Sequence, residues 1–211
     1  MDDKVREDVR VRRMAERGDY DRSTIDAILD EAYVGHVGFV DDGRPVVIPM
    51  VVWRFNDHLH IHSANKGRLA SVCAGTAVCV SVTHVDGLVL ARSAYNHSMN
   101  YRSLVVHGVC EVVDNPAERT AALQALVDHF APGRWGALRP MKAKELAATV
   151  VLRVPLEHAA AKIRRGMPGD AVEDAGFPVW TGIVPINTAV GQPLPDPTMP
   201  PGDLPGSPVR R

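Results

Sequence analysis

The sequence contains few cysteines, and its three, Cys73, Cys79 and Cys110, form no CxxC pair. An odd number without such a pair argues against a disulfide framework and against a structural zinc site, and it predicts a reducing, cytoplasmic location. Neither charge sign dominates, because 24 lysines and arginines are balanced by 25 acidic residues. We therefore expect no nucleic acid partner and no attraction to an anionic membrane.

Long hydrophobic runs are also missing. The longest, PVVIPMVVW at residues 45–53, contains two prolines and is far shorter than the roughly 20 residues that cross a bilayer. The first 18 residues mix both charge signs and include no apolar stretch of the kind found in signal peptides. The sequence therefore predicts a protein without a membrane span or a secretion signal.

What the chain does contain is a series of short β-branched segments separated by turns. About six or seven strands are predicted, and they follow one another through hairpin turns rather than crossover helices. This order favours a closed antiparallel β-barrel over a doubly wound sheet. Helices are predicted at residues 23–32, from 66 to about 74, and at 116–130, where a proline occupies the first turn. Residues 159–165, AAAKIRR, are compatible with a helix or a strand.

One domain is predicted, and it covers residues 23–190. Before it lies a charged, weakly ordered lead-in of residues 1–22. After it comes a tail of residues 191–211 that holds seven of the sixteen prolines. Proline cannot donate a ladder hydrogen bond, so this tail is not expected to form a regular sheet. Within the domain, the apolar segment 77–91 is expected to break near its Asp-Gly pair.

Three histidines alternate in residues 58–68, which read HLHIHSANKGR. On a strand, His58, His60 and His62 share one face, and two histidines about 6.5 Å apart can chelate a metal. The chain offers no HExxH motif, second HxH or nearby carboxylate pair to complete such a site. We therefore favour polar residues on a wetter strand face and predict no metal.

The residues that follow, Ser63 to Arg68, lie where the predicted strand gives way to a helix. The first backbone N–H groups of a helix lack partners, and small residues let a ligand approach them closely. Lys66 and Arg68 can each add a charge-assisted hydrogen bond of about 1.5–3 kcal/mol. A solvated basic turn accounts for the same residues, and the turn alone does not decide between the two interpretations.

A second polar cluster, ARSAYNHSMNYRS at residues 91–103, favours the anion site. It contains two arginines, two tyrosines, two asparagines and a histidine but no acidic residue. Arg92 and Arg102 therefore need an anion from outside the segment, and the tyrosines can stack on a flat ring. A hydrolase is excluded, because the adjacent His97 and Ser98 point apart on an extended chain and no GxSxG motif exists.

Taken in order, these segments resemble the FMN-binding split barrels related to pyridoxamine 5'-phosphate oxidase, which include the nitroimidazole-resistance proteins. The resemblance runs from about residue 20 to residue 185 and is carried by YDRSTIDAILDEAYVGHVGFVDDGRPVVIPM, LHIHSANKGR, VCVSVTHVDGLVLARSAYNHSMNYRSLVVHG and FPVWTGIVPI. It implies a mainly β fold, a six-stranded antiparallel split β-barrel with a few flanking helices. It also implies a homodimer with FMN in the cleft between subunits. The C-terminal substrate-binding motif of the true oxidase is not recognisable, which argues against oxidation of pyridoxamine phosphate.

The resemblance also implies which residues contact the flavin. The backbone of residues 48–51 would follow the isoalloxazine ring, and His62 resembles the histidine that nitroimidazole-resistance proteins place beside their cofactor. The basic turn would bind the phosphate, residues 100–103 would close the site, and Trp180 would cover it from the partner. The implied cofactor-binding residues are Ile48, Pro49, Met50, Val51, His62, Ser63, Lys66, Arg68, Asn100, Tyr101, Arg102, Ser103 and Trp180.

Three functions remain open on the sequence. The first is a flavin-dependent oxidoreductase or reductase of a small planar substrate, in which the cofactor carries the electron chemistry. The second is a non-catalytic protein that binds, stores or senses a flavin, a deazaflavin or haem, for which any of nine histidines is an available axial ligand. The third is a metal site on the histidine strand. No catalytic residue is predicted.

Overall fold

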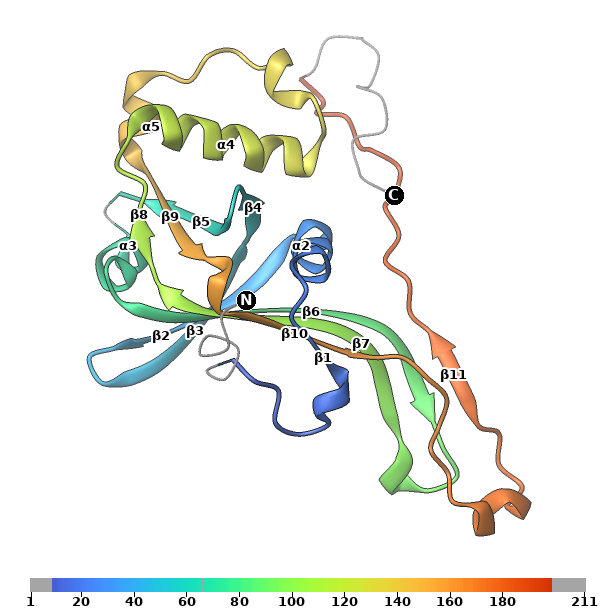
Figure 1. The fold of residues 1–211 in the computed structure, drawn as a ribbon. Helices are drawn as coiled ribbons and strands as arrows, with labels where there is room; N and C mark the ends of the chain where they lie inside the picture. Colours follow the sequence, from blue (N-terminus) through green and yellow to red (C-terminus); the bar gives the residue numbers. More distant parts are fainter. Residues whose placement is uncertain (1–8, 66, 199–211) are drawn as a thin grey trace.

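Two antiparallel sheets form the body of the protein in the computed structural model, which describes residues 9–65 and 67–198 (Figure 1). The larger sheet has the strand order β1-β10-β7-β6-β2-β3, and β11 pairs with the outer end of β6. Its strands are β1 (Gly18–Asp19), β2 (Val34–Asp41), β3 (Arg44–Val51), β6 (Ala77–Leu90), β7 (Ser98–Val109), β10 (Ala159–Arg164) and β11 (Gly182–Pro185). The smaller sheet, in the order β4-β5-β9-β8, contains β4 (Trp53–Phe55), β5 (His58–Ala64), β8 (Glu111–Val112) and β9 (Thr149–Pro155). The predicted mainly β, antiparallel fold class is confirmed.

Helices cover the sheets on two sides. The α-helices are α2 (Arg22–Glu31), α3 (Arg68–Cys73), α4 (Pro116–Phe130) and α5 (Ala143–Ala148), and short 3-10 turns are η1 (Ala15–Arg17), η2 (Ala94–Asn96), η3 (Arg134–Ala137), η4 (Leu156–His158) and η5 (Val172–Gly176). Figure 1 shows α4 above the smaller sheet. No helix in the described ranges is long and apolar enough to cross a membrane.

The main core lies between the two sheets and α2. Ile25 and Leu29 of α2 pack with inward residues of both sheets, among them Leu59 and Val80. A second, smaller core lies between the smaller sheet and α4 and includes Trp53. The smaller sheet is therefore covered on both faces.

This double cover corrects the interpretation of the histidine strand. The side chain of His60 is only 1% exposed, so the prediction that it lies on a wetter face is wrong. His58 and His62 are half-buried. The pattern of β5 gave no sign of the second cover, because α4 is contributed by a segment more than fifty residues further along the chain.

One further expectation is wrong, one ambiguous segment is resolved, and part of the lead-in is ordered. The predicted break near Asp86 is only a register irregularity between Val85 and Gly87, and β6 continues through it. The ambiguous AAAKIRR segment is mainly the strand β10. Within the predicted lead-in, residues 15–19 form η1 and β1, because β1 pairs with β10.

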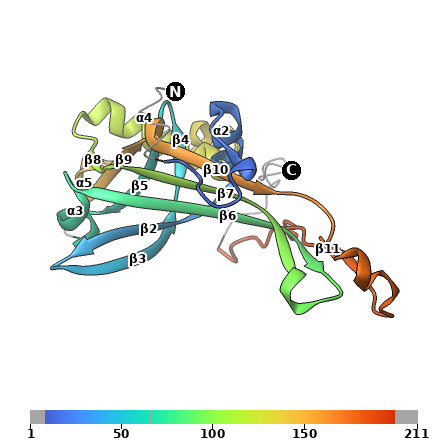
Figure 2. The ribbon, with the colours of Figure 1, turned by 60° about the horizontal axis from the view of Figure 1, so that its bottom comes forward.

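The far ends of β6 and β7 extend away from the body and form, with β11, a projection that we call the arm (residues 85–101 and 165–186; Figures 1 and 2). Arg92 anchors it, since its backbone N–H and Nη1 both donate to the Asp170 carboxylate, at 2.9 and 3.0 Å. Gly87 is required where β11 pairs with β6, because a Cβ there would lie 2.9 Å from Ile183 Cγ2 and 3.1 Å from the Val184 carbonyl oxygen.

Candidate functional site

The strand β5 contacts both the edge strand β3 and the helix α3, and α3 also contacts β2. In the part of the chain that the structure describes, β3 is the last strand of the larger sheet, so one side of its backbone has no strand partner. Pro45 and Pro49 are typical of such an edge, since proline has no N–H to donate to a ladder. Residues 48–51, His62, Ser63 and Arg68 lie on β3, β5 and α3, and we call them the first group.

The turn between β5 and α3 is tight. Gly67 donates its backbone N–H to the Ala64 carbonyl oxygen at 2.8 Å. A Cβ at Gly67 would lie 2.5 Å from Ser63 Oγ and 2.9 Å from that carbonyl, so the turn requires glycine. Lys66 lies outside the described residues, and its predicted phosphate contact stays a prediction.

Arg68 follows this turn and has a carboxylate partner. Its Nε donates to Asp41 Oδ2 at 2.6 Å, and its side chain remains 60% exposed. Asp41 ends β2, so the ion pair ties the turn to the β2–β3 hairpin. Sequence reasoning missed Asp41, although its place in the DDGRP hairpin turn could have marked it as a candidate partner.

His62 lies beside Trp53, which follows β3 by two residues, and their ring centroids are 5.8 Å apart. Burial lowers the pKa of His62, which favours a neutral imidazole. His62 Nδ1 and Trp53 Nε1 are both buried without a hydrogen-bond partner among the described residues. Buried polar atoms are nearly always hydrogen-bonded, so this pair marks the most unusual polar environment next to the first group. Sequence reasoning missed Trp53 because its apolar segment predicts only core packing.

His60 behaves differently, as a core aromatic residue. Burial lowers its pKa to about 4, and its ring stacks on Trp53 with centroids 5.7 Å apart. Its Nδ1 lies 3.3 Å from the His58 carbonyl oxygen. The described residues include no group of three or more histidine, cysteine, aspartate or glutamate side chains placed to hold a metal ion.

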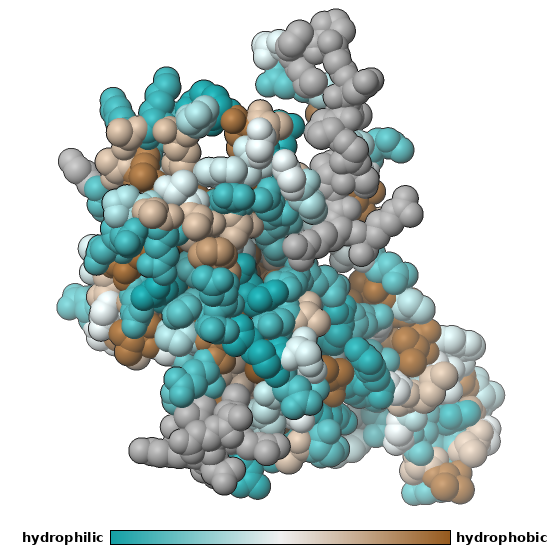
Figure 3. Space-filling model, turned by 45° about the horizontal axis from the view of Figure 1, so that its top comes forward, coloured by the Kyte–Doolittle hydropathy of each residue, from teal (hydrophilic) through white to brown (hydrophobic). Residues whose placement is uncertain are grey.

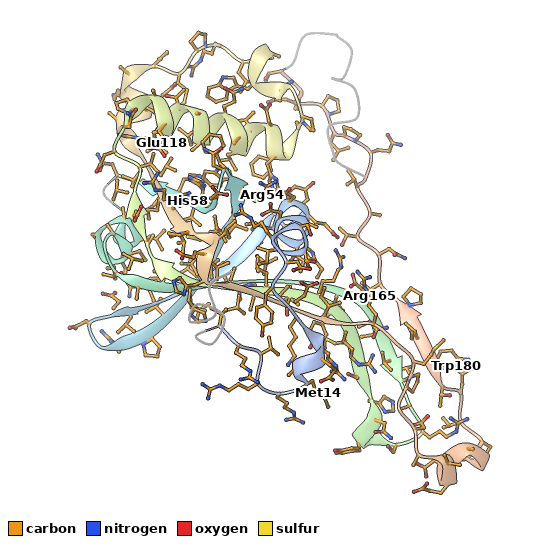
Figure 4. The ribbon with its side chains drawn as sticks, in the orientation of Figure 1. Met14, Arg54, His58, Glu118, Arg165 and Trp180 are labelled. Atoms are coloured by element: carbon orange, nitrogen blue, oxygen red, sulfur yellow. The ribbon has the colours of Figure 1, made fainter. Side chains whose placement is uncertain are left out.

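The other predicted residues, 100–103 and Trp180, form a second group that one chain does not bring to the first. Along the larger sheet, β6 and β2 separate β7 from β3, which places these two strands about 14 Å apart at a strand spacing of about 4.8 Å. Trp180 lies on the arm, with its side chain 63% exposed (Figure 4). Its predicted cofactor contact, like that of residues 100–103, stays a prediction.

The side chains of Asn100, Arg102 and Ser103 have partners within the chain. Arg102 pairs with both Glu31 and Asp86, and these hydrogen bonds lower the pKa of each carboxyl group. Asn100 donates to the Gly166 carbonyl oxygen at 3.2 Å, and Ser103 donates to that of Lys162. Tyr101 is half-buried.

The anions that the sequence analysis required for Arg92 and Arg102 are therefore carboxylates of this chain. Asp170 serves Arg92, while Glu31 and Asp86 serve Arg102. The absence of acidic residues from segment 91–103 was thus no sign of a ligand phosphate, because the compensating charges come from residues outside the segment.

Two antiparallel sheets with an edge strand and a tight glycine turn place the chain among small β-barrel proteins. Comparison with known proteins identifies the family. The family model of pyridoxamine 5'-phosphate oxidase matches residues 21–163, more than half of the chain. The chain belongs to this family, and its predicted split-barrel fold is confirmed. A comparison with curated proteins gives no match.

Two solved structures resemble the chain over nearly its whole length. The flavocytochrome Anf3 from Azotobacter vinelandii is 39% identical, with 95% of this chain and 92% of that one covered and a TM-score of 0.85. The FAD and haem binding protein from Mycobacterium smegmatis is 38% identical, with 90% and 95% covered and a TM-score of 0.86. A 5-nitroimidazole resistance protein from Bacteroides thetaiotaomicron is 24% identical over 69% of this chain and 86% of that one, with a TM-score of 0.58, and supports the fold alone.

Proposed function

We propose that the chain binds a flavin and haem together and functions as a redox protein of the flavocytochrome kind. The observation that carries the proposal is the similarity, at 38–39% identity and over at least 90% of each chain, to a flavocytochrome and to a protein that binds FAD and haem. The same similarity supports FAD in place of the FMN that the sequence resemblance implied. It also supports haem over deazaflavin.

The first group suits a flavin. The unpaired side of β3 offers backbone donors and acceptors to a planar ring, and the turn at Gly67 lets a phosphate approach the backbone. Burial lowers the pKa of His62, the one histidine of the group, so His62 would present a neutral imidazole to the flavin. Lys66 and Arg68 would hold the phosphate, with Asp41 keeping the Arg68 guanidinium in place.

Haem requires an axial ligand from the protein, and two histidines are suited to this role. His36 on β2 and His107 on β7 are exposed, whereas their chain neighbours Val37 and Val106 are buried in the main core. Side chains alternate along a strand, so both histidines point to the outer face of the larger sheet. An exposed imidazole there is accessible to iron, unlike that of the buried His60.

We further propose a homodimer in which the second group of one chain completes the site of the other. The arm exposes large hydrophobic side chains, which soluble monomers rarely gather in one place (Figure 3). They include Leu88, Met99, Phe177, Val179, Trp180 and Val184. A second copy that covers these residues would also bring Trp180 to a site that one chain leaves incomplete.

When bound, a flavin supplies two-electron chemistry and haem supplies one-electron chemistry. The chain's own contribution would be to orient both groups and to exclude water, since the described first group has no carboxylate or thiol placed as a nucleophile. Turnover of a small planar substrate is part of the proposal, and a reductive assay with a nicotinamide donor tests it.

The test of cofactor content is an absorption spectrum of the purified protein, with released flavin identified by chromatography. We expect twin flavin bands and a Soret band, with FAD as the released flavin. His36→Ala and His107→Ala, compared with His97→Ala on the arm, test the axial ligand, and one of the first two is expected to lose the Soret band while keeping the flavin bands. Purified protein that shows neither set of bands after addition of FAD and haem would contradict the proposal.

A further inference from the structure

A cavity of about 500 Å³ opens where β1 and β10 separate. The two strands pair only at Gly18 and Asp19, and beyond this point η1 and the chain after β10 diverge. Arg17 of η1 lines one side of the cavity, and Arg164 and Arg165 line the other. Figure 4 shows Arg165 at the end of β10 and Met14 just before η1. This region is remote in the fold from the turn at Gly67.

The charge in the cavity is positive. Three guanidinium groups face two carboxylates, those of Glu16 and Asp19. Both oxygens of Asp19 already accept hydrogen bonds, one from the Asp21 backbone N–H and one from the Thr24 hydroxyl, each at 2.9 Å. Glu16 forms an ion pair with Arg17, 3.8 Å from its Nε, and its side chain is 67% exposed. Two carboxylates against three guanidinium groups leave the cavity with one net positive charge.

The arginines also retain hydrogen-bond donors. Arg164 is held in place by three neutral acceptors, the Asn100 side chain and the carbonyl oxygens of Gly166 and Met167, which leave its Nε–H available. Within the described residues, Arg165 makes no hydrogen bond or ion pair. Asp86, the carboxylate whose pKa it lowers, is already bound by Arg102.

We propose that this cavity is a binding site for a small organic molecule that carries a phosphate or carboxylate group, separate from the first group. The planar guanidinium fork matches both groups with two parallel hydrogen bonds, which explains why arginine is the residue that recurs here. The volume lies within the roughly 300–1,000 Å³ of small-molecule sites and far exceeds the size of an inorganic ion. Ile163 and Met167 give the remainder of the ligand an apolar wall.

The experiment is calorimetric titration of the flavin-loaded protein with two probes, inorganic pyrophosphate and citrate. We expect saturable binding of at least one probe with the flavin spectrum unchanged. Binding of pyrophosphate alone identifies a phosphate ligand, and binding of citrate alone identifies a carboxylate ligand. Arg165→Ala, which removes an exposed side chain without a described partner, is expected to weaken binding roughly tenfold or more.

The matched control is Arg12→Ala, which removes the same charge from an exposed position that does not line the cavity. Its binding should stay within about twofold of the unsubstituted protein, because exposed charges at a distance are screened by salt. Equal losses in both variants, no saturable binding of either probe, or release of flavin by the probe would each overturn the proposal. A protein that binds no flavin would contradict the proposed function instead, and the same titration of the purified protein without flavin would still test the cavity.

Discussion

At the scale of single residues, the histidines of β5 show how one strand can hold the same side chain in different chemical states. His60 is enclosed between the main core and α4 and stacks on Trp53, while His62 sits at the margin beside the edge strand. Burial disfavours the charged imidazole in both, and it lowers the pKa of His60 to about 4. The consequence for His60 concerns stability, and the consequence for His62 concerns ligand binding.

The buried His60 predicts that the protein loses stability in mild acid. The unfolded chain takes up a proton at His60 near pH 6.5, whereas the folded chain does so only near pH 4. Between these values the unfolded state binds more protons, so stability falls as pH falls, by about 1.5 kcal/mol from pH 6.5 to pH 5. Denaturant unfolding at both pH values measures this loss. The His60→Phe variant keeps an aromatic ring against Trp53, and its free energy of unfolding should fall by about 1.5 kcal/mol less over the same pH range. An unchanged pH dependence in His60→Phe would refute the assignment.

The glycine in the turn before α3 predicts a specific loss of flavin. In Gly67→Ala, the added Cβ must push Ser63 and the Ala64 carbonyl oxygen aside, which moves the backbone that would receive the phosphate. We expect FAD affinity, measured by fluorescence titration, to fall roughly tenfold or more, the loss expected when one charge-assisted hydrogen bond is broken. Gly136→Ala is the matched control, because a Cβ there meets no atom within 4 Å. Equal affinities of the two variants would place the phosphate elsewhere.

At the scale of elements, the sequence predicts what local chemistry determines. The helix α4 begins at Pro116, as expected, and the Asn115 side chain caps it by accepting hydrogen bonds from the Ala117 and Glu118 backbone N–H groups. The β2–β3 hairpin follows from the DDGRP turn, in which Asp42 and Gly43 have the positive φ angles that a tight hairpin requires.

Elements that depend on distant partners were not predictable in the same way. The short strands β1 and β11 become strands only because β10 and β6 offer them an edge, and neither has a hydrophobic alternation of its own. The partners of the candidate site follow the same rule, since Arg102 reaches Glu31 across 71 residues of sequence. Sequence patterns thus locate the turn and the edge strand of the site, and they do not reveal which charges the fold has already neutralised.

The close pairing of β11 with β6 at Gly87 predicts how the arm can be loosened. In Gly87→Ala, the new Cβ would collide with Ile183 Cγ2 at 2.9 Å and approach the backbone of Val184, so β11 should separate from β6 while the body remains folded. Hydrogen exchange should become faster at the amides of residues 182–185 and remain unchanged in β5 and β9. The same Gly136→Ala control applies. Unchanged protection of β11 would show that the arm adapts by moving as one unit.

At the scale of the whole molecule, the proposed homodimer rests on the position of the two residue groups. The first group lies at the β3 edge, and Trp180 lies on an arm that extends away from it (Figures 1 and 4). If two chains build each site, one chain contributes the turn at Gly67 and the other contributes the arm. Complementation between two variants tests this arrangement through flavin binding alone, whatever the substrate is.

Gly67→Ala and Trp180→Ala should each weaken FAD binding when the variant is purified alone. In a dimer that pairs one copy of each variant, one site combines both substitutions, and the other combines an intact turn with an intact arm. Tagging the two variants differently and purifying the mixed dimer should therefore restore one FAD site of normal affinity per dimer, because the intact parts meet only across the interface. Recovery of normal sites would require the crossed arrangement. Two uniformly weakened sites in the mixed dimer would mean that each chain binds its flavin with its own residues, and the exposed apolar arm would then need a different partner.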